Sequence, residues 1–137
     1  MDEIRRALLQ SWLIKAANDL KNSRIVAAAA DGPLDTAIYH CQQAAEKAVK
    51  AYLIFRGLTP QKTHDIRKLT LQASEFDAQF DQFLDHAAAL TPYAWEFRYP
   101  DDLAETYPTR EEFDEAPKQA DEIYRFVLSL LPAEVAP

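Results

Sequence analysis

Only two of the 137 residues are glycine, Gly32 and Gly57, and this scarcity limits the folds open to the chain. Tight β-hairpin turns rely on residues that adopt positive φ, and glycine does so without steric cost. The sequence therefore argues against a β-sandwich or barrel and favours helices. At this length a single domain with a substantial core is expected.

Apolar residues recur at helical spacing along nearly the whole chain, in segments separated by helix-breaking signals. A first helix is predicted from about Asp2 to Ala30, and Asp31-Gly32-Pro33 ends it. A second helix is predicted from Leu34 to about Arg56, and Gly57 ends it. Glycine directly after the last turn, with proline beyond it, is typical of a helix end.

The middle of the chain predicts a short helix followed by a longer, interrupted one. Thr63 is the expected cap of a helix from His64 to about Ser74. Apolar residues from Phe76 to Phe97 then follow spacings of four and three, which indicates a helix packed in a bundle. Pro92 is expected to kink that helix, or to restart it with Thr91 as the cap.

A last helix completes the predicted fold. Thr109 begins it with a capping box, and Pro117 is expected to bend it or delay its regular part. Before it, Pro100 and Pro108 bracket an acidic loop. The fold predicted is all-α, an antiparallel up-and-down bundle of four to five helices. It forms a single domain over residues 1–137, with its core at about 8–131 and a short tail at 132–137.

The formal net charge of −7 is concentrated in one segment. Residues 101–122 contain nine acidic and two basic residues, so the rest of the chain is neutral overall. Between Lys47 and Lys68 the balance reverses, with six basic residues and one aspartate. These are either two solvated faces of opposite sign, or a basic surface for a phosphate-bearing ligand. The acidic total excludes a protein that coats DNA non-specifically.

Several site classes are excluded by simple patterns. Cys41 is the only cysteine, so the chain forms no internal disulfide or thiolate metal cluster, as is typical of a cytoplasmic protein. Its place in an apolar row indicates a core residue and not a nucleophile. His40, His64 and His86 are too far apart for a zinc motif, and there is no phosphate-binding glycine loop. We expect no membrane span, metal, cofactor or catalytic residue.

Three short polar groups remain as candidates for function. The first is the segment from His40 to Lys50, in which Glu46 and Lys50 form a favourable i, i+4 pair. The second is Thr63-His64-Asp65, where His64 has a side chain that can donate to a ligand. The third is Phe97-Arg98-Tyr99-Pro100. Arg98 either caps helix carbonyls or offers a planar fork to a phosphate or carboxylate.

Taken together and in this order, these groups resemble the HEPN domain family over about residues 8–131. The residues that carry the resemblance are Trp12 through Leu20, Gln42-Gln43-Ala44-Ala45-Glu46-Lys47-Ala48-Val49-Lys50, Gly57, Thr63-His64-Asp65-Ile66 with Leu69, and Arg98-Tyr99-Pro100-Asp101. The resemblance implies an antiparallel helical bundle that is usually a homodimer. It also implies partnership with a small nucleotidyltransferase encoded alongside. The surplus of aromatic residues in the fourth helix also favours a dimer.

Many members of the family are ribonucleases or toxins, in which an arginine is followed four to six residues later by a histidine. After Arg98 this sequence has no histidine at those positions, and Asp101 and Asp102 would repel a phosphate. A metal-free ribonuclease needs a general acid or base beside the scissile phosphate. The resemblance therefore predicts a non-catalytic protein that binds a nucleotide or serves a nucleotidyltransferase.

The residues predicted to line a nucleotide cleft are Arg98, Tyr99, Lys47, Lys50 and His64. Arg98 would hold the phosphate charge, and Tyr99 would stack on the base. In the alternative interpretation Arg98 pairs with a carboxylate, such as Glu46 or Asp101, and only ties helices together. Two other functions stay open: a metal-independent endoribonuclease toxin, and a dimeric scaffold without a ligand.

Overall fold

The computed structural model describes residues 1–100 and 107–137, and all regular structure in these ranges is helical. The α-helices are α1 (Glu3–Ala28), α2 (Leu34–Phe55), α3 (Ile66–Ser74), α4 (Leu84–Leu90) and α5 (Arg110–Leu130). Three short 3₁₀ helices accompany them: η1 (Ala78–Phe83), η2 (Thr91–Ala94) and η3 (Ala133–Val135). The predicted all-α class is confirmed.

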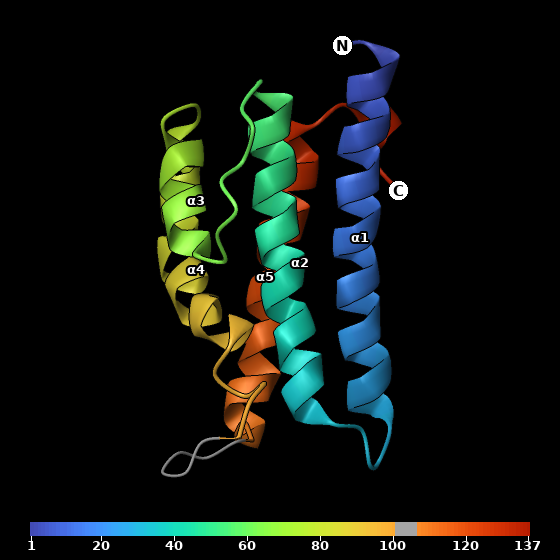
Figure 1. Cartoon of the computed structure of the whole chain (residues 1–137), viewed down its shortest axis with the longest axis vertical. Coiled ribbons are helices and arrows are strands. Elements are labelled where there is room, and N and C mark those ends of the chain that lie inside the picture. The colour runs from blue at the N-terminus through green and yellow to red at the C-terminus, as the bar shows by residue number, and fades with distance from the viewer. Residues whose placement is uncertain (101–106) are drawn as a thin grey trace.

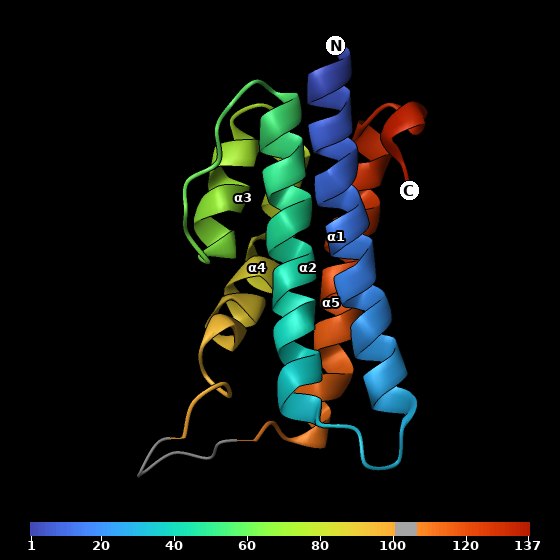
Figure 2. The same ribbon diagram turned by 45° about the vertical axis from the view of Figure 1, so that its right-hand side comes forward.

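Helix α2 runs through the middle of the bundle. In Figures 1 and 2, α1 lies along one side of α2 and runs antiparallel to it, whereas α3 and α4 lie on the other side. Helix α5 packs against α2 and also contacts α1 and α4. The loop after α2 runs back along that helix, so α3 points in the same direction as α2 (Figure 1). The bundle is therefore organised around a single central helix.

The sequence of α2 suits this central place because small residues alternate with larger apolar ones. Five of its alanines have no exposed surface: Ala37, Ala44, Ala45, Ala48 and Ala51. Small side chains let neighbouring helices approach closely. Near the end of α2 the Tyr52 ring lies 4.6 Å from that of Phe80, which lies 4.9 Å from that of Phe126. This aromatic cluster joins α2, η1 and α5.

Gly57 ends α2, as predicted, because the backbone there has a φ of +92°. The amides of Gly57 and Leu58 donate to the carbonyls of Ile54 and Leu53, each at 2.9 Å. This pair of bonds is a Schellman motif, which requires a left-handed residue at the position of Gly57. Arg5 of α1 completes the cap, since its guanidinium donates to the Ile54 carbonyl at 2.7 Å.

Gly32 lies in the turn between α1 and α2, and glycine is required there for a different reason. A Cβ atom at this position would lie 1.8 Å from the carbonyl oxygen of Val26, so the turn has no room for a side chain.

The predicted capping box of α5 is also confirmed. Thr109 accepts from the Glu112 amide at 3.1 Å, and the Glu112 carboxylate accepts from the Thr109 amide at 2.9 Å.

The predicted start of the third helix was wrong by two residues. Asp65, and not Thr63, caps α3, with its carboxylate accepting from the Lys68 amide at 3.1 Å. Thr63 instead accepts from the amide of Asp65 itself, at 3.1 Å. The fourth helix, which was predicted to be interrupted at Pro92 alone, is divided further, because residues 78–94 form η1, α4 and η2 in succession. The interruption predicted near Pro92 is present, but η2 begins one residue earlier, at Thr91, with Leu90 and not Thr91 as its cap residue.

Helix α5 continues through Pro117 as a single element from Arg110 to Leu130. After it, η3 folds back against α1, and Val135 in this segment is fully buried. The segment 132–137 therefore adds to the core, beyond what the sequence indicated. The acidic loop predicted between Pro100 and Pro108 lies mostly outside the described residues. No helix in the described ranges is both long and apolar enough to cross a membrane.

Candidate functional site

Asp19 of α1 ties α1 to α2 through two basic side chains. Its carboxylate accepts from Lys47 Nζ at 2.6 Å and lies 2.8 Å from His40 Nδ1. Lys47 and His40 are seven residues apart, which places them two turns apart on the same face of α2. Asp19 is only 8% exposed, so these partners compensate for the burial of its charge.

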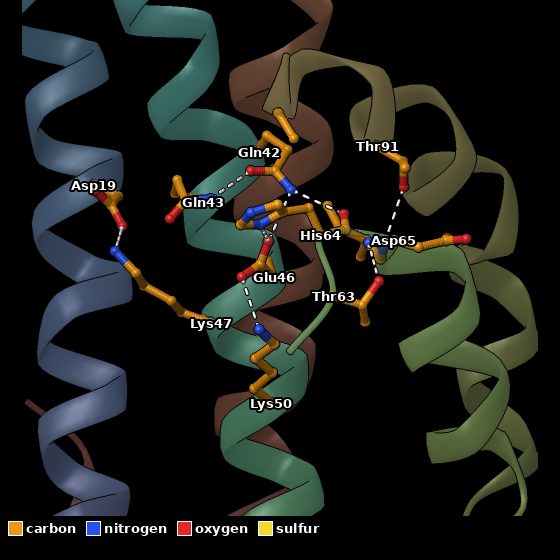
Figure 3. A network of polar contacts seen from close by, with 12 residues as sticks. Asp19, Gln42, Gln43, Glu46, Lys47, Lys50, Thr63, His64, Asp65 and Thr91 are labelled. Carbon is orange, nitrogen blue, oxygen red and sulfur yellow. Dashed lines mark hydrogen bonds and ion pairs between the residues drawn. The ribbon is translucent and has the colours of Figure 1, made fainter. Parts of the chain in front are cut away.

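Glu46 is the centre of a second polar group, shown in Figure 3, that joins α2 to the loop before α3. Its carboxylate accepts from Lys50 Nζ at 3.0 Å and from Gln42 Nε2 at 3.0 Å. His64 Nδ1 lies 2.8 Å from the same carboxylate, and Gln42 also donates to the His64 carbonyl at 3.1 Å. An ionised carboxylate only accepts hydrogen bonds, so this geometry assigns a proton to His64 Nδ1. The predicted pair between Glu46 and Lys50 is confirmed.

Arg98 follows η2, and aromatic rings flank its exposed guanidinium. The guanidinium carbon lies 4.3 Å from the centre of the Tyr39 ring and 5.5 Å from that of Tyr99. Arg98 also donates to the Ala94 carbonyl at 3.3 Å, a helix-capping contact that is one of the two roles the sequence left open for it. A cation held over an aromatic face is attracted to the ring and fixed in direction.

A hollow of about 320 Å³ opens beside this arginine. Its walls come from the first turns of α2 and from the segment after η2: Asp35, Thr36, Tyr39, His40, Phe97 and Arg98. We call it the Arg98 hollow. His40 connects it to the first polar group, because the same imidazole contacts Asp19.

The structure divides the five residues predicted to line one cleft into three groups. Lys50 and His64 meet at Glu46, and Lys47 pairs with Asp19. Arg98 lines the Arg98 hollow, and the Tyr99 ring lies beside the Arg98 guanidinium. Lys47 is connected to this hollow indirectly, because it contacts Asp19, which in turn contacts His40 in the lining. Lys50 lies more than two helical turns from His40 along α2.

The alternative interpretation, in which Arg98 pairs with Glu46, is wrong. Glu46 is engaged by Lys50, His64 and Gln42 instead. The other proposed partner, Asp101, lies outside the described residues. What remains of this interpretation on the described chain is the contact of Arg98 with the Ala94 carbonyl.

Asp19, Tyr39 and His40 were not among the five predicted site residues, although the segment that begins at His40 was one of the candidate polar groups. Asp19 had a weak signal, since an acid beside the apolar row of Ala16 and Leu20 needs a buried partner. Tyr39 had no signal, and nothing in the sequence joined Tyr39 or His40 to Arg98, because only the folded chain brings these residues together.

Other chemistry in the described residues is limited. Cys41 is fully buried, and burial raises the pKa of its thiol to about 12, so it is a core residue as expected. Within residues 1–100 and 107–137 no group of three or more His, Cys, Asp or Glu residues is arranged to hold a metal ion.

With the fold and these contacts established, comparison with known proteins is informative. Residues 9–130 match the family model for the HEPN domain, which is nearly the whole chain. The chain belongs to the HEPN family. A search among curated proteins finds no significant match.

Two solved structures resemble this HEPN protein over almost its full length. TT1696 from Thermus thermophilus is 28% identical, with a TM-score of 0.79 over 90% of this chain and 98% of the other. ST0689, an archaeal HEPN homologue, is 29% identical, with a TM-score of 0.69 over 89% of this chain and 96% of the other. The predicted HEPN-like bundle is confirmed.

Within this HEPN protein the three sequence groups have distinct structural places. The block from Gln42 to Lys50 supplies the buried polar contacts of α2, and His64 fastens the following loop to it. Arg98 and Tyr99 present an exposed cation and an exposed aromatic ring, with Tyr99 63% exposed. The His64 side chain is also exposed, but its Nδ1 already contacts the Glu46 carboxylate. Of the candidate residues, these two are therefore the best placed to contact a ligand.

Proposed function

We propose that this HEPN protein is a non-catalytic accessory subunit that binds a nucleotide at the Arg98 hollow and works beside a small nucleotidyltransferase. One observation carries the proposal: the Arg98 guanidinium is held over Tyr39 at the mouth of a hollow, with Tyr99 exposed next to it. A fixed guanidinium matches phosphate oxygens as a two-pronged donor. An exposed tyrosine ring offers a stacking surface to a base.

The remaining polar residues act as supports in this proposal. Lys47 and His40 both contact Asp19 beside the hollow, so the charge of Lys47 is already compensated within the protein. Arg98 is then the principal positive charge for the phosphate. Its loss is expected to weaken binding by about 1.5–3 kcal/mol, which is roughly tenfold to a hundredfold.

Isothermal titration with ATP, GTP and a short RNA tests nucleotide binding. The wild type is expected to bind at least one of them, and Arg98→Ala to bind at least tenfold more weakly. Arg24→Ala is the matched control, because Arg24 is also exposed but lies on α1, away from the hollow. Absence of heat from all three ligands would sink the proposal. Cleavage of the RNA by the wild type but not by Arg98→Ala would replace it with a ribonuclease.

The partnership rests on the family resemblance and needs its own test. The tagged protein is expected to co-purify from its native cells with a nucleotidyltransferase in stoichiometric amount. Recovery of the tagged chain without such an enzyme would contradict the partnership, although nucleotide binding by the isolated protein could still hold.

We also propose a homodimer, on the same family grounds. The aromatic surplus supports it only in part, because Phe80 and Phe97 are buried within the single chain whereas Phe76 and Trp95 are exposed. Sedimentation velocity is expected to give twice the 15.6 kDa mass of the chain. A mass of one chain at micromolar concentration would contradict the dimer.

A further inference from the structure

A second concave site lies on the other half of α2, and the proposed function does not use it. Its floor is α2, through Lys50 and Ile54, and its walls are α1, through Leu8 and Trp12, and the loop at Leu58 and Pro60. Figure 1 shows α1 on one side of α2 and this loop on the other. The cavity measures about 390 Å³, within the range of small-molecule sites. We call it the Trp12 pocket.

The walls of the Trp12 pocket are apolar, and several of them face solvent. Leu8 is 48% exposed and Leu58 is 43% exposed, although both are large apolar residues. Apolar surface left in contact with water is stabilised when a ligand covers it, at about 25 cal/mol for each Å². The pocket therefore favours a ligand with an apolar body.

A buried ammonium group at the floor selects the charge of that ligand. Lys50 is only 7% exposed, and its Nζ lies 5.9 Å from the centre of the Trp12 ring. An ammonium has three donors, and in the described ranges Lys50 makes one hydrogen bond, to Glu46. The described lining contains a second ammonium, Lys62, and no carboxylate. Glu46, which lies outside this lining, offsets the charge of Lys50, and Lys62 leaves the lining with a net positive charge that is complementary to an anion.

The pocket is also held in shape before any ligand arrives. The loop that forms one wall is fastened at its start by the cap at Gly57 and at its end by His64, which Gln42 and Glu46 of α2 hold. Glu46 is held by Gln42 and His64 and also accepts from Lys50, so the ammonium is oriented by a fixed partner. A preformed site loses less entropy on binding than a mobile one.

We propose that the Trp12 pocket binds a small apolar carboxylate, with the ring or acyl chain between Trp12, Leu8 and Leu58 and the carboxylate at the Lys50 ammonium. The site is independent of the Arg98 hollow, because Lys50 lies ten residues, or about 15 Å, along α2 from His40. The two proposals can therefore fail separately.

Fluorescence titration of the full chain tests this site. The Trp95→Phe background leaves Trp12 as the sole tryptophan, and the probes are phenylacetate and octanoate. We expect saturable quenching or enhancement of Trp12 fluorescence by at least one of the carboxylates. Phenylacetamide and phenethylamine, which keep the ring but lack the negative charge, are expected to bind at least tenfold more weakly than phenylacetate.

Substitutions at exposed positions locate the site without disturbing the core. Leu8→Asp places a negative charge in the wall and is expected to weaken carboxylate binding at least tenfold. Ile25→Asp is the matched control, since Ile25 is an exposed apolar residue of the same helix outside the pocket, and it is expected to leave binding unchanged.

Any one of three results with these carboxylates and variants would overturn the proposal. They are no response to either carboxylate up to 10 mM, equal binding of phenylacetate and its amide, and equal weakening by Leu8→Asp and Ile25→Asp. Much tighter binding of a peptide that ends in phenylalanine would also overturn it, because the occupant would then be a protein partner and not a small carboxylate.

Discussion

At the scale of single residues, Glu46 determines how the polar interior of this molecule is held. It is 4% exposed and accepts from Lys50, Gln42 and His64 together. A second glutamate, Glu122, also contacts a histidine, His86 at 2.6 Å, but its side chain is 59% exposed. Both glutamates contact a histidine, but Glu46 is buried and Glu122 is exposed. Comparing the two therefore separates the effect of burying the carboxylate from the effect of pairing it.

Replacing Glu46 with Ala is expected to destabilise the protein by about 3–5 kcal/mol, because Lys50 is left as a buried, unpaired charge. Glu122→Ala is expected to cost about 0–1 kcal/mol, since solvent screens its exposed pair. Urea denaturation of both variants measures the difference. Equal costs for the two substitutions would show that the buried group is not a specific support.

Gly57 is required by its backbone and not by lack of space. A Cβ there would meet only Arg5 Nη2, at 3.4 Å, whereas its φ of +92° is strained for residues with side chains. Gly57→Ala is expected to destabilise the protein by about 1–2 kcal/mol. Gly57→Asn is expected to cost less, because asparagine tolerates this conformation. Thermal unfolding followed by circular dichroism compares the two, and equal losses would contradict the backbone argument.

Cys41 gives the stability a dependence on alkaline pH. Burial raises the pKa of the thiol to about 12, while in an unfolded chain it is about 8.5. Above pH 8.5 the unfolded chain loses this proton and the folded chain keeps it, so the free energy of unfolding falls as pH rises. From pH 8.5 to 10 the wild type is expected to lose about 1–2 kcal/mol more than Cys41→Ala. Parallel pH profiles in urea titrations would contradict this.

At the scale of helices, the long amphipathic elements were predictable, and the short ones were not. The bounds of α1, α2 and α5 follow from capping residues and glycines, whose effect on the backbone is limited to the few residues next to them. The prediction for residues 78–94 was wrong because their apolar spacings of four and three do not distinguish the two kinds of helix. These spacings fit an α-helix, but a 3₁₀ turn also places residues i and i+3 on one side. Here tertiary contacts of Phe80 decide the local backbone.

The candidate site was predictable only as a set of residues. The i, i+4 pair of Glu46 and Lys50 could be predicted because both lie on one helix. The contacts of Asp19 with Lys47, and of Arg98 with Tyr39, join residues that are 28 and 59 positions apart. Their pairing depends on how the helices pack, which local spacing does not specify.

Pro117 is the clearest local conflict within an element. It lies inside α5, and proline has no backbone N–H. The Phe113 carbonyl therefore lacks the helical hydrogen bond that it would accept from the amide of residue 117. Pro117→Ala is expected to stabilise the protein by about 1–2 kcal/mol. This is the helix cost of proline, at most about 3 kcal/mol, reduced by its rigidity in the unfolded chain. Guanidinium denaturation measures the change, and a loss of stability would show that α5 needs the proline.

At the scale of the whole molecule, the central place of α2 has a consequence for the motions of the protein. Since α1, α3 and α5 all pack on this helix, its middle turns can open only when the bundle around them separates. We expect the amide hydrogens from Ala44 to Leu53 to exchange with solvent slowest of all, at the rate set by global unfolding. The ends of α1 and the short η1–α4–η2 stretch are expected to exchange sooner, through local opening. Mass spectrometry in heavy water should therefore find one slow core, which coincides with the helix that links the Arg98 hollow to the Trp12 pocket.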